Sequence, residues 1–147
     1  MGVRKTPFNL GRFVEAQQAV FDGVVAELRS GQKSSHWMWF VFPQLRGLGR
    51  SETARLYAIS GLPEARAYLA HPVLGARLRE CTALVNAIEG KTAEQIFGSI
   101  DALKFRSSMT LFAYAARQEG GVFREALGKF FATADDPLTA ARLQSPD

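Results

Sequence analysis

The segment from Asp101 to Arg117 constrains the fold most, because it has the pattern of a helix that is apolar on nearly every side. Its apolar residues are Leu103, Phe105, Met109, Leu111, Phe112, Tyr114 and Ala115. A helix without a polar face is usually covered by its neighbours. We therefore expect this segment to be the central helix of the fold.

The rest of the chain also has helical periodicity and almost no period-2 alternation. Apolar spacing, capping residues and prolines predict further helices at 11–29, 52–59, 63–70, 72–88, 92–98, 122–132 and 137–143. Residues 34–44 are expected to form a short buried helix or strand that Pro43 ends. We predict an all-α fold, a compact single-domain bundle of about six to eight helices, several of them short. The domain is expected at 11–143, between an N-terminal extension (1–10) and a C-terminal tail (144–147).

Composition excludes several classes of protein. The chain has one cysteine and two histidines, so no disulfide framework, metal centre or resident cofactor is expected. No dinucleotide-binding fingerprint is present. No apolar run approaches the length of a membrane span, and the N-terminus lacks the apolar core of a secretion signal. We expect a soluble cytoplasmic protein.

The positive charge is concentrated in the first third of the chain. Residues 1–50 contain seven basic and three acidic side chains, whereas 51–147 contain eleven of each. No acidic residue lies between Glu27 and Glu52. We call 28–51 the basic segment. Such a local surplus favours a small anionic ligand over a broad nucleic-acid footprint.

Both tryptophans, Trp37 and Trp39, lie within the basic segment, and the simplest interpretation is that they belong to the core. Polar residues flank them at Lys33, Ser34, Ser35, His36 and Gln44. Buried polar groups need partners, and an aromatic wall with cationic neighbours suits a planar anion. The block therefore has two interpretations, a core element or a ligand-binding wall.

The loop from Arg46 to Ser51 leads into a predicted helix. Its glycines allow close backbone approach, and Arg46 and Arg50 together with the helix N–H groups are suited to a phosphate or carboxylate. The simpler alternative is a surface loop in which Ser51 caps the helix.

Further candidates are polar residues on helices. Lys104 and Ser108 lie four residues apart on the central helix, as a nucleophile and its base can, although Lys104 can also reach solvent. Gln17 lies in an apolar helix face, either as a structural tether or as a ligand contact. His71 is a general acid–base candidate, or simply the residue that begins a helix at Pro72.

Several of these residues belong to blocks that resemble a bacterial domain-of-unknown-function family, whose members are often labelled calpastatin. The blocks are 13–17, 31–44 with the sequence His-Trp-Met-Trp-Phe, 47–51, Tyr57, 68–78 and 101–112. The resemblance covers about 11–143 and implies a mainly helical domain that stands alone. It implies no reaction. The calpastatin label does not suit this composition, because that inhibitor is a long disordered repeat protein.

We predict one polar cleft that binds a small anionic, nucleotide-like metabolite, with hydrolase or transferase activity conceivable. The catalytic candidates are His36, His71, Lys104 and Ser108. The ligand-binding candidates are Gln17, Lys33, Ser35, Trp37, Trp39, Gln44, Arg46, Arg50 and Ser107. The alternative is a protein-interaction module with an exposed patch at Trp37-Met38-Trp39. Nonspecific nucleic-acid binding is a third, disfavoured hypothesis, and no membrane partner is expected.

Overall fold

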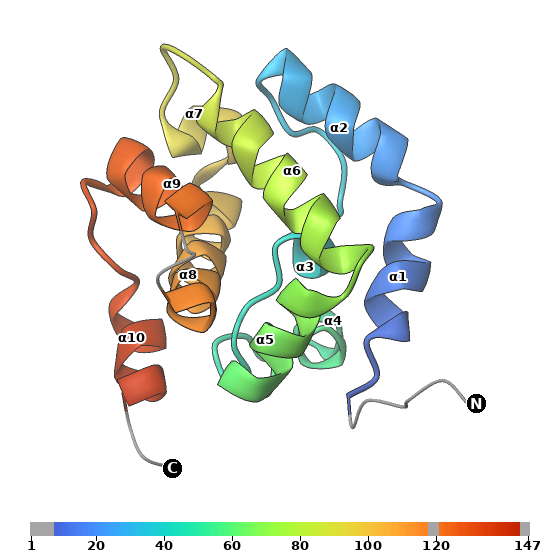
Figure 1. The fold of residues 1–147 in the computed structure, drawn as a ribbon. Helices are drawn as coiled ribbons and strands as arrows, with labels where there is room; N and C mark the ends of the chain where they lie inside the picture. The colour runs from blue at the N-terminus through green and yellow to red at the C-terminus, as the bar shows by residue number, and fades with distance from the viewer. Residues whose placement is uncertain (1–7, 118–120, 145–147) are drawn as a thin grey trace.

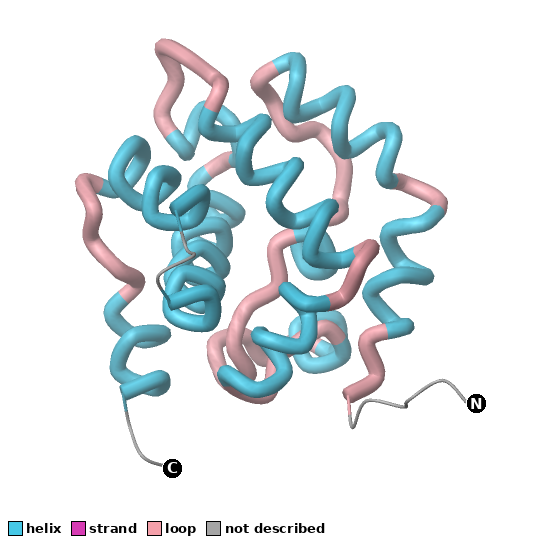
Figure 2. The backbone as a smooth tube through the Cα atoms, in the orientation of Figure 1, coloured by secondary structure: helices cyan, strands magenta, loops and turns pink. Residues whose placement is uncertain are grey.

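In a computed structural model, the described residues 8–117 and 121–144 form ten helices joined by loops and no strand (Figures 1 and 2). The helices are α1 (Gly11–Gln18), α2 (Phe21–Ser30), α3 (Met38–Val41), α4 (Glu52–Leu56), α5 (Leu62–Ala70), α6 (Leu74–Asn86), α7 (Ala93–Phe97), α8 (Ser99–Ala116), α9 (Gly121–Phe131) and α10 (Pro137–Gln144). The all-α prediction is confirmed. Residues 1–7 of the expected extension and 145–147 of the expected tail lie outside the described residues.

Helix α8 is central, as its apolar surface predicts. It contacts α3, α5, α7, α9 and α10. Phe105, Met109 and Phe112 on this helix are completely buried, and Phe105 packs edge-on against Phe42 from the aromatic block. The aromatic block is thereby anchored to the middle of the fold.

The predicted helix 11–29 is wrong in one respect, because it is divided into α1 and α2. Val20 has non-helical backbone angles (φ −120°, ψ −6°), and Figure 1 shows the two helices running in different directions. No glycine or proline marks the break. Helix α1 packs on α3 while α2 packs on α6, so tertiary contacts override a local pattern that is helical throughout.

The loop between α3 and α4 is held against the residues that follow α4. The N–H of Ile59 donates to the carbonyl of Gln44 (2.8 Å), and the N–H of Arg46 donates to the carbonyl of Ile59 (2.7 Å). This bridge draws the chain away from helical geometry, so α4 ends at Leu56 rather than at the predicted residue 59. The loop and the end of α4 therefore lie side by side.

No helix in the described ranges is long and apolar enough to cross a membrane. Cys81 on α6 is completely buried, and this burial raises the pKa of its thiol to about 12. A reactive thiol at this position is therefore excluded, as its place on the apolar side of the helix suggests.

Candidate functional site

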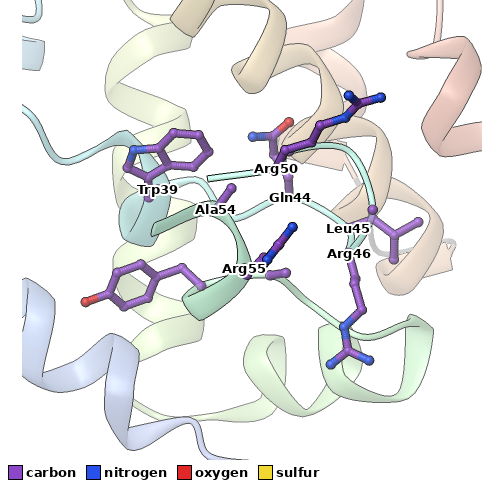
Figure 3. A pocket seen from close by; sticks show the side chains of 11 residues that line it. Trp39, Gln44, Leu45, Arg46, Arg50, Ala54 and Arg55 are labelled. Carbon is purple, nitrogen blue, oxygen red and sulfur yellow. The ribbon is translucent and has the colours of Figure 1, made fainter. Parts of the chain in front are cut away.

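A pocket of about 500 Å³ lies between α3, the loop that follows it and α4 (Figure 3). We call it the Trp39 pocket. Its lining residues are Trp39, Gln44, Leu45, Arg46, Gly47, Gly49, Arg50, Ala54, Arg55, Tyr57 and Ala58. Gly49 permits the close approach of loop and helix, because a Cβ atom there would lie 2.6 Å from the Cβ of Ala54. Ser51 caps α4 by accepting a hydrogen bond from the N–H of Ala54 (3.1 Å), as the sequence predicts.

Three arginines of the Trp39 pocket carry uncompensated charge. Arg46, Arg50 and Arg55 are exposed, and the structure shows no ion pair or side-chain hydrogen bond between any of them and the described part of the chain. Figure 3 shows Arg55 in the middle of the view, with the guanidinium groups of Arg46 and Arg50 pointing in different directions. The pocket therefore offers several separate donors to an anion.

Trp39 forms a wall of this pocket and is half-buried. The ammonium group of Lys104 lies 3.6 Å from the centroid of its ring, which is cation–π geometry. Lys104 thus covers part of the indole and restrains it. The part that lines the pocket is available to a ligand.

Lys104 is itself held by a carboxylate that also binds Lys33. Asp101 accepts from Lys104 through Oδ1 (3.1 Å) and from Lys33 through Oδ2 (2.9 Å). Burial raises the pKa of Asp101, but the two lysines outweigh it and lower the pKa below its ordinary value. Lys33 and Lys104 are thus paired with one shared counter-charge rather than facing an open anion site.

The second tryptophan, Trp37, has all its contacts inside the protein. Its indole Nε1 donates to Glu27 Oε1 (2.9 Å), and this carboxylate also accepts from the N–H groups of Ser34 and Ser35 and from the Ser35 hydroxyl. Burial raises the pKa of Glu27, but these hydrogen bonds outweigh it, the Ser35 hydroxyl contributing most, and hold the pKa at about 2. Glu27 is thus the acceptor that organises 34–37.

This burial corrects the interaction-module hypothesis. Trp37 and Met38 are only 1% and 2% exposed, because both belong to the hydrophobic core. A continuous exposed patch at Trp37-Met38-Trp39 therefore does not exist. Of these three residues, Trp39 alone is half-buried, and it lines the Trp39 pocket.

The predicted single cleft is divided in the structure. Ser35, His36 and Trp37 line a separate hollow beside Glu27, which has no lining residue in common with the Trp39 pocket. Lys104 and Ser107 line a third hollow, which adjoins the Trp39 pocket. The bend at Trp37 and the short helix α3 send successive side chains of the aromatic block to different sides of the fold, which the spacing alone does not reveal.

Gln17 and His71 have partners that suit their structural interpretations. The buried amide of Gln17 donates to the carbonyl of Phe40 (2.7 Å) and to the hydroxyl of Tyr68 (3.1 Å). The Nδ1 atom of His71 accepts from the N–H groups of Val73 and Leu74 (3.1 and 3.2 Å) and so caps the start of α6. Neither side chain lines the Trp39 pocket.

Ser108 is completely buried, and its hydroxyl has no hydrogen-bond partner in the described structure. Lys104, four residues earlier, directs its ammonium group to Asp101 and Trp39 instead. The geometry of an activated nucleophile, a hydroxyl hydrogen-bonded to its base, is therefore not formed.

Sequence reasoning missed Arg55, Tyr57, Glu27 and Asp101 as members of these sites. Arg55 lies about one helical turn after the loop 46–51, and this spacing was a signal that it lies near Arg46 and Arg50. Glu27 is the boundary of the basic segment, and Asp101 lies three residues before Lys104. The contact of Asp101 with Lys33 spans much of the chain and has no local signal.

Taken together, the fold and pocket define an all-α domain with an arginine-rich pocket that is walled by an aromatic ring. Residues 7–143 match the family described as "Protein of unknown function (DUF1810)", and the chain belongs to this family. The crystal structure of the conserved hypothetical protein Rv1873 from Mycobacterium tuberculosis is similar, with a TM-score of 0.93 and 54% identity over 95% of this chain and 99% of that chain. The comparison with curated proteins finds no match. The expected membership of a family of unknown function is thereby confirmed.

Proposed function

We propose that this protein binds a small, planar, anionic metabolite of the nucleotide kind in the Trp39 pocket. The observation that carries the proposal is the combination of three arginines without counter-charges and a partly open indole ring around one pocket. A volume of about 500 Å³ is within the usual range for small-molecule sites.

The arginines supply the anion-binding half of the site. Arg46, Arg50 and Arg55 come from the loop and from α4, so they approach the pocket from different positions along the chain. A guanidinium group binds phosphate or carboxylate oxygens through two parallel hydrogen bonds. Because no acidic side chain of the described chain neutralises them, binding an anion costs no internal ion pair.

The planar half of the ligand is assigned to Trp39. An indole face suits stacking with a base or another flat ring, and the contact with Lys104 keeps the ring in place. Gln44 and Tyr57 also line the pocket, and they offer an amide and a hydroxyl to the polar edge of such a ring.

The proposal is for binding rather than for catalysis. No histidine, aspartate or glutamate is among the described residues that line the Trp39 pocket. These are the side chains that most often act as general acid or base in hydrolases and transferases. His36 instead lines the hollow beside Glu27, and His71 caps α6.

Isothermal titration with adenosine monophosphate, adenosine and inorganic phosphate tests the proposal. We expect the monophosphate to bind more tightly than either fragment, and Arg55→Gln to weaken it at least about tenfold through the lost charge-assisted hydrogen bonds. Arg29→Gln is the matched control, because Arg29 is an exposed arginine on α2 that lines none of the described pockets. The affinity of this variant for adenosine monophosphate should stay within about twofold of the wild-type affinity.

Failure of adenosine monophosphate, inorganic phosphate, sugar phosphates and organic acids to bind would overturn the proposal. Equal weakening by Arg55→Gln and Arg29→Gln would also overturn it, because it would show a general charge effect rather than a site.

A further inference from the structure

Three large apolar side chains are unusually exposed next to the Trp39 pocket. Ile100 and Leu103 at the start of α8 are 70% and 62% exposed, and Leu138 at the start of α10 is 67% exposed. Single exposed apolar residues are common, but these three line the same hollow of about 290 Å³. A gathered apolar surface of this kind marks a binding site more often than a scattered one does. We call this hollow the apolar groove.

The apolar groove adjoins the Trp39 pocket. Trp39, Gln44 and Gly49 line both, so the indole is the partition between them. No side chain stands between the two hollows at Gly49. A Cβ atom there would point toward Ala54 and lie 3.8 Å from the Trp39 ring. A ligand held in the pocket can therefore extend past Gly49 into the groove.

The two hollows differ in polarity in the same way as the two ends of an amphiphile. The pocket carries the three unpaired arginines, whereas the groove carries the three exposed apolar side chains. The groove also contains two charged residues, Lys104 and Asp136. The ammonium group of Lys104 is paired with Asp101, and the Asp136 carboxylate Oδ2 accepts from the N–H and hydroxyl of Thr139 and caps α10. Both charged groups are thus engaged with the protein, and the groove favours a hydrocarbon segment over a second charged group.

We propose that the ligand is an anionic amphiphile, whose phosphate or carboxylate group binds the arginines and whose alkyl, acyl or aryl segment lies in the apolar groove. This inference rests on the proposed anion site and names the substrate class of that site. It accounts for the exposure of Ile100, Leu103 and Leu138, since the hydrocarbon segment covers them in the complex.

A homologous series of alkyl phosphates, from methyl to hexyl phosphate, tests the inference by isothermal titration. We expect the Kd to fall with each added methylene, by at most about fourfold where the methylene is fully buried and by less where the groove leaves it open to solvent. Leu103→Ser and Leu138→Ser should flatten this dependence and leave the affinity for methyl phosphate unchanged.

Leu56→Ser is the matched control. Leu56 is 55% exposed but lines neither the groove nor the pocket, so the full dependence on chain length should persist in this variant. All three leucines are exposed, and their substitution is expected to leave the fold intact.

The outcomes separate the two proposals. If methyl phosphate binds, depends on Arg55 and shows the same Kd as hexyl phosphate, the amphiphile inference is overturned and the anion site stands. If no member of the series binds and adenosine monophosphate also fails, the anion site itself is overturned.

Two further outcomes would also overturn the amphiphile inference. One is a light-scattering mass that corresponds to a dimer for the wild type and to a monomer for Leu103→Ser. This result would show that a second copy of the chain covers the groove in the wild type. The other is binding to vesicles containing phosphatidate without binding of hexyl phosphate, because the partner would then be a bilayer surface.

Discussion

Trp37 and Trp39 are two residues apart in one aromatic block, yet their surroundings differ completely. Trp37 is 1% exposed, and its N–H is bound by Glu27. Trp39 is half-buried, is covered in part by Lys104, and lines a pocket with three unpaired arginines. The first tryptophan belongs to the interior, and the second belongs to the candidate site.

The difference lies in the counter-charges around each ring. Near Trp37, Glu27 accepts from the N–H groups of Ser34 and Ser35 and from the indole N–H, and Asp101 binds Lys33. Near the pocket side of Trp39, Arg46 and Arg50 have no such partner among the residues described. Positive charge that is neutralised inside the protein supports the fold, whereas positive charge without a partner is available to a ligand.

Trp37→Ala should have the largest effect on stability. It removes a fully buried indole that packs on Phe42 and leaves Glu27 without one of its donors. We expect a loss of about 3–5 kcal/mol in the free energy of unfolding, measured by urea denaturation. A loss below about 1 kcal/mol would show that the side chain is not a core element.

Asp101→Asn should have the next largest effect. The side chain of Lys33 is 7% exposed, so removal of the carboxylate leaves a nearly buried ammonium group without its counter-charge. We expect a loss of about 2 kcal/mol by the same measurement, less than for a fully buried pair. Glu15→Gln, an exposed acid on α1, is the control and should change stability by less than about 0.5 kcal/mol.

Glu27→Gln should produce a smaller, pH-dependent effect. The pKa of Glu27 is about 2 in the folded protein against an ordinary 4.5, so its ionised form stabilises the fold above pH 4.5. This contribution is lost as the pH falls from 4.5 toward 2. The stability difference between the wild type and Glu27→Gln should therefore shrink over that range in urea titrations. A constant difference from pH 7 to pH 2 would contradict the proposed role of this carboxylate.

Trp39→Ala should have the smallest effect on stability but a large effect on ligand binding. The ring is half-buried, so we expect a loss of only about 1 kcal/mol. Binding of adenosine monophosphate should nevertheless weaken at least about tenfold because the stacking wall is removed. Unchanged affinity with intact stability would remove Trp39 from the site.

The predicted features with strong local signals agree with the structure. The central position of α8 follows from its apolar circumference, and the N-cap at Ser51 follows from residue type and position. The division of 11–29 at Val20 had no local signal, because α1 and α2 separate to pack on different partners.

The candidate site was less predictable for the same reason. The basic segment located Arg46, Arg50 and Trp39, which the structure brings to one pocket. It also grouped them with Lys33 and Trp37, which Asp101 and Glu27 retain in the interior. Charge counting along the sequence finds surplus cations, but only the fold shows which of them have a carboxylate nearby.

Fluorescence of single-tryptophan variants tests the difference between Trp37 and Trp39 most directly, because the chain has two tryptophans. Trp37→Phe leaves Trp39 as the only reporter, and Trp39→Phe leaves Trp37. With adenosine monophosphate as the added ligand, we predict a saturable change in emission from Trp39 and none from Trp37. A saturable change from Trp37, or equal changes from both, would contradict the assignment of Trp39 to the site and Trp37 to the interior.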